Sequence, residues 1–276
     1  MHILIATGGS GHSDLAVQLG NAFVDAVGGD AVLLNVVRHE QDREHGKSLV
    51  KRAARLWAPY LPPPKVKVRV GEAAPEIIAE AHEGRYQLIV VGERVHHRIL
   101  SRLLSPTAER VIAQAPCPVL VAKALTREFR NILVCDSGAD QQPLIGRFTA
   151  ALPELLSPGA DITVLHVMSQ MGAAPGVRGW QLRADAESLM EARTPEGELL
   201  FHDLKLLHNS SAHSEAKIRH GRVVDEILAE AENDAYDLVV IGTHRAEGWQ
   251  RLLLDDIARQ IIHDVQRPIL VVQQHK

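Results

Sequence analysis

Short, unbroken aliphatic runs alternate with amphipathic stretches along the whole chain. Runs of this kind are typical of parallel strands that are covered on both faces. The pattern predicts strands at residues 3–6, 31–36, 66–70, 88–91 and 119–122, and again at 132–135, 162–167, 216–219, 238–241 and 269–272. Alternation of strands and helices predicts an open, doubly wound parallel sheet.

Helix signals lie between these runs. Apolar residues at helical spacing extend from Leu15 to Ala26, and Gly28 and Gly29 follow as a stop signal. Pro75 predicts the start of a second helix, and a third is expected at about 106–114. In the second half, Thr194-Pro195 predicts an N-cap followed by the first helical residue.

The two halves of the chain repeat each other. Segment 71–121 matches segment 221–271 without a gap at a shift of 150 residues, whereas the first strands match at a shift of 129, so 21 extra residues lie in the second half. A repeat of this length predicts two similar domains. We place them at 1–126 and 127–276, each with a five-stranded, mainly parallel sheet, and we place an insertion at about 168–220.

Composition narrows the class of protein. The chain has 276 residues, 46% hydrophobic residues, a net charge of -4 and two cysteines. A chain of this length can bury a core without disulfides, and its mild acidity gives no general attraction to nucleic acid. No apolar stretch approaches the ~20 residues of a membrane span, and the N-terminus lacks the pattern of a signal peptide. We expect a cytoplasmic protein with no nucleic-acid or membrane partner.

An ordered set of short motifs occurs twice. It consists of a strand ending in glycine, a polar loop, a helix and a strand entered through proline, at 90–92, 101–104 and 115–121, then at 240–244, 251–254 and 267–271. This set, with the opening 3–13, resembles the universal stress protein family in its tandem form. The resemblance implies two Rossmann-like domains of the adenine-nucleotide α-hydrolase type, paired through Val119–Val121 and Ile269–Val272, since an apolar edge strand needs a partner. It also implies a stress-response protein that acts by binding and hydrolyses ATP slowly at most.

Many members of that family bind ATP through Gly, two residues, Gly, nine residues, Gly and then Ser or Thr. In the first repeat Gly92 matches, but Val95 and Ser105-Pro106 replace the rest. In the second repeat Gly242 matches, but Arg245 and Asp255-Asp256 replace the rest. Both motifs are therefore degenerate, and the two aspartates of the second repeat would repel a triphosphate.

The first repeat keeps some features of an anion site. Ser105 can cap the helix that follows it, which would leave the N–H groups of Thr107 and Ala108 available, and arginines including Arg94 lie nearby in the sequence. The acidic residue that the family places beside adenine corresponds to Gly8 in the first repeat and Ser137 in the second, with Asp136 one place early.

The resemblance implies a set of nucleotide-binding residues at the carboxyl ends of the strands. They are Thr7, Gly8, Asn35, Gly92, Arg94, Ser105 and Thr107 in the first repeat and Asp136, Val167, Gly242 and His244 in the second. The implied ligand is ATP or AMP with Mg²⁺. The main hypothesis is a protein whose nucleotide-binding sites no longer work, and two alternatives to it stay open. One is regulation by a nucleotide bound in the first repeat, and the other is a pure interaction module for an unknown protein partner, with homo-oligomers also open.

The remaining histidines, cysteines and unusual segments are expected to have structural roles or to border the ligand site. Fifteen histidines show no metal-binding spacing, and His96 and His97 are neighbours that do not easily face one ion. Cys117 and Cys135 are expected to be small buried apolar residues. Segment 173–180, within the insertion, is expected to be a surface connection or a loop over the second site. Trp249 is expected under the ligand site or at an interface.

Overall fold

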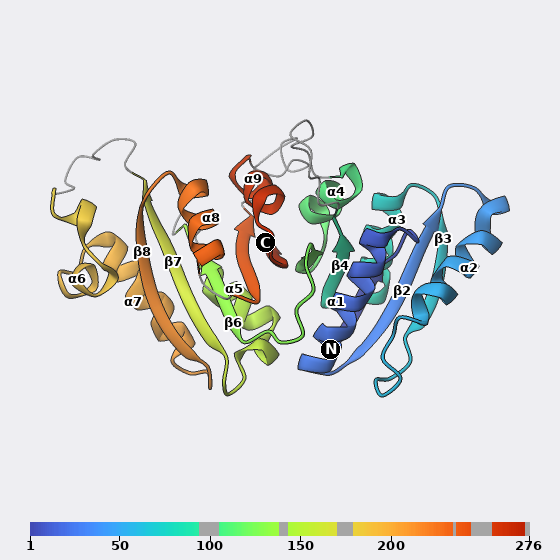
Figure 1. Cartoon of the computed structure of the whole chain (residues 1–276), viewed down its shortest axis with the longest axis horizontal. Helices are drawn as coiled ribbons and strands as arrows, with labels where there is room; N and C mark the ends of the chain where they lie inside the picture. Colours follow the sequence, from blue (N-terminus) through green and yellow to red (C-terminus); the bar gives the residue numbers. More distant parts are fainter. Residues whose placement is uncertain (94–104, 138–142, 170–178, 234–235, 244–255, 274–276) are drawn as a thin grey trace. The chain divides into compact units, whose positions relative to one another are not determined.

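The computed structural model describes residues 1–93, 105–137, 143–169, 179–233, 236–243 and 256–273 (Figure 1). The chain divides into two compact units, which we call the first unit (1–128 with 243–276) and the second unit (129–242). Arg94 and His244 lie outside the described residues, as do His96, His97, Trp249 and residues 173–178.

The sheet of the first unit has the order β3-β2-β1-β4-β5-β10. Neighbouring strands from β3 to β5 run parallel, and β10 is antiparallel to β5. Its strands are β1 (His2–Ala6), β2 (Asp30–Val37), β3 (Lys65–Val70), β4 (Leu88–Gly92), β5 (Val119–Ala122) and β10 (Ile269–Gln273). Its helices are α1 (Gly11–Val27), α2 (Arg43–Ala54), α3 (Ala73–Gly84), α4 (Pro106–Gln114) and α9 (Asp256–Asp264), with the short η1 (Glu40–Asp42).

The second unit has a parallel sheet in the order β9-β6-β7-β8. Its strands are β6 (Asn131–Cys135), β7 (Asp161–Ser169), β8 (His213–Gly221) and β9 (Leu238–Thr243). Its helices are α5 (Leu144–Ala151), α6 (Ala186–Glu191), α7 (Pro195–Leu207) and α8 (Val223–Asn233), with the short η2 (Pro153–Leu156) and η3 (Gln181–Arg183). The segment expected as an insertion contains α6, α7 and most of β8.

The predicted strands are all present. The inner strands have fully buried centres, such as Leu4, Val90 and Val134, whereas β3 and β8 have only exposed and half-buried residues. The count of five strands in each domain is not confirmed. The described residues give six strands to the first unit and four to the second. The reason is that β10, which belongs to the second repeat, pairs with β5 and so extends the sheet of the first unit.

Local capping chemistry sets the helix boundaries. The hydroxyl of Ser105 accepts the N–H of Ala108 at 3.2 Å, and Pro106 is the first residue of α4. The hydroxyl of Thr194 accepts the N–H of Gly197 at 3.1 Å, and α7 begins at the following proline. Gly28 ends α1 at φ 75°, where a glycine is favoured. These caps confirm the predicted starts of α4 and α7 and the end of α1.

Strands β5 and β10 join the ends of the two repeats. Leu120 lies opposite Leu270, with Val121 opposite Ile269 and Val119 opposite Val271. The predicted pairing through Val119–Val121 and Ile269–Val272 is therefore present in the structure. In the described part of the chain, every helix is too short or too polar to cross a bilayer.

Candidate functional site

The candidate site of the first unit lies where β1, β2 and β4 end. The N–H of Thr7 donates to the carbonyl of Leu34 at 2.8 Å, and the side-chain amide of Asn35 donates to the carbonyl of Thr7 at 2.7 Å. Both side chains are buried, with 3% of each residue exposed. Two buried oxygens, Thr7 Oγ1 and Asn35 Oδ1, accept no hydrogen bond from the described residues. The fold thus brings together two of the predicted residues, and Gly8 follows them at the exposed turn.

The start of α1 is capped by its own serines. Ser13 Oγ accepts the N–H of Ser10 at 2.9 Å and donates to the carbonyl of Ser10 at 2.7 Å. Gly92, the surviving motif glycine, packs against this start, because a Cβ there would overlap the carbonyl oxygen of His12. Close packing of β4 on α1 is therefore enough to require a glycine at position 92.

A carboxylate of the chain itself occupies the start of α4. Glu93 is only 3% exposed, and its two oxygens accept the N–H of Ser105 at 3.0 Å and the hydroxyl of Ser105 at 3.1 Å. A negative charge is stabilised there by the helix dipole and by these donors. The expectation that the N–H of Ala108 is available was wrong, because the Ser105 hydroxyl accepts it. Thr107 lies half-buried in the same turn.

The second unit makes the equivalent strand-end contacts with different side chains. The N–H of Asp136 donates to the carbonyl of Leu165 at 3.1 Å, and Nδ1 of His166 lies 3.1 Å from the carbonyl oxygen of Asp136. The Asp136 carboxylate is buried and accepts the N–H of Leu144 at 2.9 Å, so it caps α5. Val167 is half-buried on β7.

Gly242 borders the same helix start, because a Cβ there would lie 3.4 Å from a side-chain carbon of Leu144. It would also lie 3.0 Å from Nη2 of Arg147. Asp136 and Gly242, both predicted site residues, therefore meet at the start of α5.

Asp203 is a residue of this region that sequence reasoning missed. It lies on α7 with no exposed surface, and neither carboxylate oxygen has a hydrogen-bond partner among the described residues. Burial raises the pKa of Asp203 to about 7, and repulsion from Asp136 adds to the shift. The second unit therefore holds an ionisable group that titrates near neutral pH.

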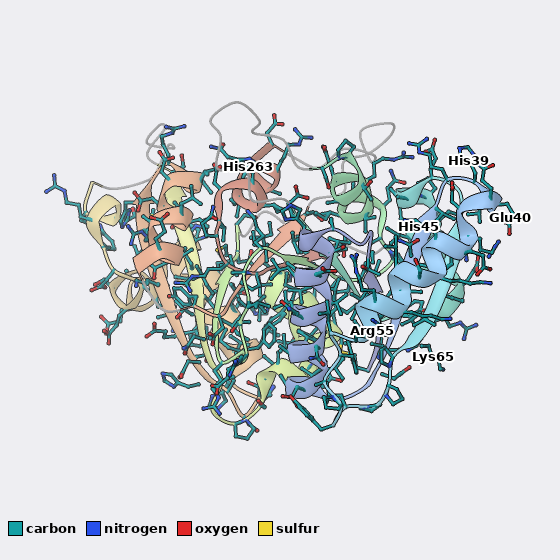
Figure 2. All side chains as sticks on the ribbon, turned by 45° about the vertical axis from the view of Figure 1, so that its right-hand side comes forward. His39, Glu40, His45, Arg55, Lys65 and His263 are labelled. Atoms are coloured by element: carbon teal, nitrogen blue, oxygen red, sulfur yellow. The ribbon has the colours of Figure 1, made fainter. Side chains whose placement is uncertain are left out.

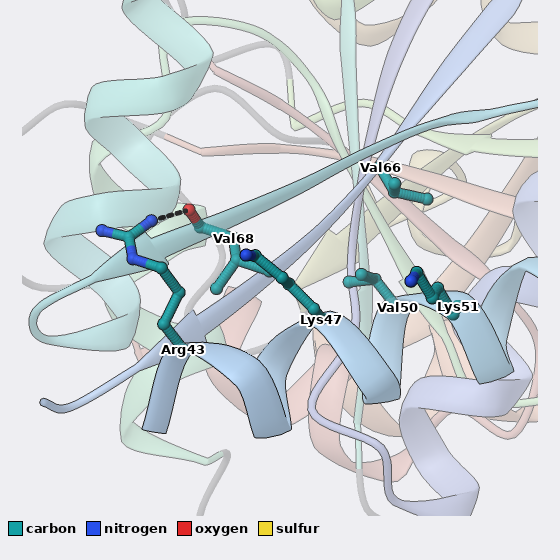
Figure 3. A pocket seen from close by; sticks show the side chains of 6 residues that line it. All are labelled: Arg43, Lys47, Val50, Lys51, Val66 and Val68. Carbon is teal, nitrogen blue, oxygen red and sulfur yellow. Dashed lines mark hydrogen bonds between the residues drawn. The ribbon is translucent and has the colours of Figure 1, made fainter. Parts of the chain in front are cut away.

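A separate small pocket lies at the outer edge of the first unit (Figure 3). Its volume is about 240 Å³. It is lined by Arg43, Lys47, Val50 and Lys51 of α2 and by Val66 and Val68 of β3. Figure 2 shows further polar side chains on the same side of the unit, with Glu40 in η1, His45 on α2 and Lys65 at the start of β3.

Two of the three cations of this pocket, Arg43 and Lys47, have partners within the chain. Arg43 donates to the carbonyl of Val68 at 3.3 Å and to Glu40 at 2.8 Å, and Lys47 pairs with Glu44 at 2.6 Å. Charged side chains of this kind shield an edge strand from pairing with another chain. The pocket is therefore explained as protection of the edge strand β3.

Metal and thiol chemistry find little support in the described residues. That part of the chain contains no cluster of three or more His, Cys, Asp or Glu side chains able to hold a metal ion. Cys117 is buried, as predicted, whereas Cys135 is half-buried, and both are free thiols.

The fold and these strand ends define a tandem α/β protein of the doubly wound type. A sequence model described as the Universal stress protein family matches residues 1–123 and 128–273. The chain therefore belongs to the universal stress protein family, in its two-repeat form.

Individual relatives are distant in sequence. Universal stress protein MJ0531 of Methanocaldococcus jannaschii is 28% identical over 120 residues, which are 42% of this chain and 67% of that protein. A universal stress protein structure from Archaeoglobus fulgidus covers 99% of this chain and 98% of its own, with 18% identity and a TM-score of 0.67. A family protein from Arabidopsis thaliana, solved with AMP bound, covers 53% of this chain and 92% of its own, with 15% identity and a TM-score of 0.36.

Proposed function

We propose that this chain is a non-enzymatic stress-response protein of the cytoplasm that acts by binding a protein partner and has lost tight nucleotide binding in both repeats. The observation that carries this proposal is the Glu93 carboxylate at the start of α4. A phosphate bound at that helix start would need the N–H and hydroxyl of Ser105, which Glu93 already uses, and would meet its negative charge.

The second repeat supports the same conclusion. Asp136 is committed to the cap of α5, and Asp256 adds a further carboxylate in the first turn of α9, with 98% of its side chain exposed. Asp136 directly follows β6, and Asp256 lies at a helix start, and these are positions at which a phosphate-binding protein would present N–H groups or cations. The proposed protein catalyses no reaction other than, at most, slow hydrolysis of ATP.

A second candidate function is regulation by ATP or AMP bound in the first repeat. It is favoured by the two buried oxygens Thr7 Oγ1 and Asn35 Oδ1, which could each accept a hydrogen bond from a ligand or from water. The remaining predicted residues of this site are Gly8, Gly92, Arg94, Ser105 and Thr107, and Arg94 would supply a cation for a phosphate.

Calorimetric titration of the full chain with ATP and Mg²⁺ separates the two candidates, once co-purified nucleotide has been sought by native mass spectrometry. We expect no carried nucleotide and no saturable heat at millimolar ATP. We also expect Glu93→Ala to gain measurable binding of ATP or inorganic phosphate, because it frees the donors of Ser105.

The matched control is Glu83→Ala. Glu83 lies on α3, is exposed and pairs with Arg69, so its removal should leave ATP and phosphate binding unchanged. One saturable site in the unaltered chain, weakened by Asn35→Ala and by Arg94→Glu, would instead establish the second candidate.

A further inference from the structure

Four elements of the first unit come from equivalent positions in the two repeats. Helix α4 and strand β5 belong to the first repeat, and α9 and β10 lie 150 residues further along in the second. The antiparallel pairing places Leu120 opposite Leu270, which are themselves equivalent residues. The four elements are therefore related by an approximate two-fold axis that passes between these leucines.

Glu109 and Arg259 are also equivalent residues, and they contact each other. Nε and Nη2 of Arg259 donate to Oε1 of Glu109 at 3.0 and 2.7 Å. Each side chain is only 25% exposed, so the pair is largely shielded from solvent. Equivalent residues that touch each other lie at the axis, where a pairing of two identical repeats would bring two identical side chains together.

The ends of the two helices are held across the same axis. Nζ of buried Lys123 donates to the carbonyls of His263 and Val265, each at 2.6 Å, and to that of Ile262. Its equivalent, Gln273, donates from Nε2 to the carbonyl of Ile112 at 3.0 Å. The opposite helix is thus capped in each case from the end of a strand, by Lys123 directly after β5 and by Gln273 at the end of β10. The lysine serves α9, and a neutral amide serves α4.

From these contacts we infer that Glu109 and Arg259 select the partner of each repeat. They favour pairing of the first repeat with the second and oppose pairing of either repeat with the same repeat of another chain. In a pair of first repeats, two Glu109 carboxylates would meet at the axis. In a pair of second repeats, two Arg259 guanidinium groups would meet, each with an Asp256 carboxylate 2.8 Å away. Specificity of this kind comes from repulsion in the wrong pair as well as attraction in the right one.

Single charge reversals in the full chain reproduce, within one molecule, the like-charge contact that a pair of identical repeats would have. Glu109→Arg places two arginines at the axis, as in a pair of second repeats. Arg259→Glu places two glutamates there, as in a pair of first repeats. The double exchange, Glu109→Arg with Arg259→Glu, restores opposite charges in reversed positions.

Hydrogen exchange of peptides from β5 and β10 measures how often this pairing opens. We expect each single reversal to raise the exchange rate about tenfold or more, and the double exchange to recover most of the protection. High salt should reduce the difference between single and double variants, which a purely steric effect would not do. Size-exclusion chromatography of the same samples reports whether opened chains associate.

The matched control is Lys47→Glu, which reverses one charge of the exposed pair with Glu44 and should leave β5 and β10 protected. Unchanged protection in both single reversals overturns the inference. So does a double exchange that opens as readily as the single variants, because complementarity of charge would then have no role.

Discussion

The two repeats are alike where the third strand meets the helix that follows it, and they are unlike where the central strands end. In each repeat a fully buried glutamate accepts hydrogen bonds from a lysine at 2.6 Å, an arginine at 3.0 Å and a tyrosine at 2.9 Å. The two sets are Lys67, Arg69, Glu80 and Tyr86, and Lys217, Arg219, Glu230 and Tyr236. Distances that agree this closely indicate a requirement of the fold.

At the ends of the first strands, the two units share a hydrogen bond to a backbone carbonyl but differ in the side chains around it. Asn35 in the first unit and His166 in the second both reach the carbonyl of the residue after the first strand. That residue is the neutral Thr7 in one unit and the ionisable Asp136 in the other. The fold therefore needs the hydrogen bond at this place, whereas the charge beside it is free to differ.

The largest expected effect tests the shared network. Glu80→Ala and Glu230→Ala each leave a lysine, an arginine and a tyrosine without their buried acceptor, and each should cost roughly 3–5 kcal/mol of unfolding free energy. Burial raises the pKa of Glu80, but hydrogen bonds from Lys67, Arg69 and Tyr86 outweigh burial and lower it, so the carboxylate is charged at neutral pH. Urea unfolding followed by hydrogen exchange in each unit measures both losses.

Glu83→Ala is the control for this network, because its carboxylate is 60% exposed and should be worth about 1 kcal/mol or less. A large loss for one buried glutamate and a small loss for the other would break the likeness between the repeats.

A smaller effect, specific to the second unit, is expected from Asp203. Its folded pKa of about 7 lies above the value of ~3.9 for an unfolded aspartate, so the unfolded chain releases this proton first. Stability of the second unit should therefore fall as pH rises from about 4 through 7, by roughly 2–4 kcal/mol in all.

Asp203→Asn should remove most of that slope and stabilise the second unit at pH 8, as measured by urea midpoints at pH 5 and pH 8. Protection of β1 and β2 in the first unit serves as the internal reference. A wild-type midpoint that stays level between these pH values would show that the carboxyl is solvated.

The smallest effect compares the two strand-end contacts. Asn35→Ala removes a fully buried hydrogen bond and should cost roughly 1–3 kcal/mol, whereas His166→Ala removes a half-buried one and should cost about 0.5–1.5 kcal/mol. Thermal unfolding of each variant at pH 7 gives the ranking. The reverse order would mean that His166 is held by more than its contact with Asp136.

Local chemistry made much of this fold predictable from the sequence. Ser105 and Thr194 were identified as caps because a cap depends on residues three positions away. Helix α2 was not predicted, because it is mostly polar and buries only Gly46, Val50 and Ala53.

The candidate site was harder to predict, because its decisive contacts join distant parts of the chain. Glu93 accepts the N–H of Ser105, twelve positions further along the chain, and the spacing alone does not predict this contact. Asp203 gave no signal either, since a charged residue on an amphipathic helix normally faces solvent. The domain limits 1–126 and 127–276 and the nucleotide-binding residues stay predictions.

The placement of the two cysteines gives each unit its own chemical reporter. Cys117 lies in the first unit just before β5, and Cys135 ends β6 in the second. Burial raises the pKa of Cys117 to about 12, and burial with repulsion from Glu230 and Asp136 raises that of Cys135. Because the thiolate is the reactive form, an alkylating reagent should modify buried Cys117 mainly when the first unit opens. Cys135 is half-buried, and its raised pKa should slow its reaction while the second unit is folded. The unaltered chain can therefore report the opening of its two halves separately, without an added label.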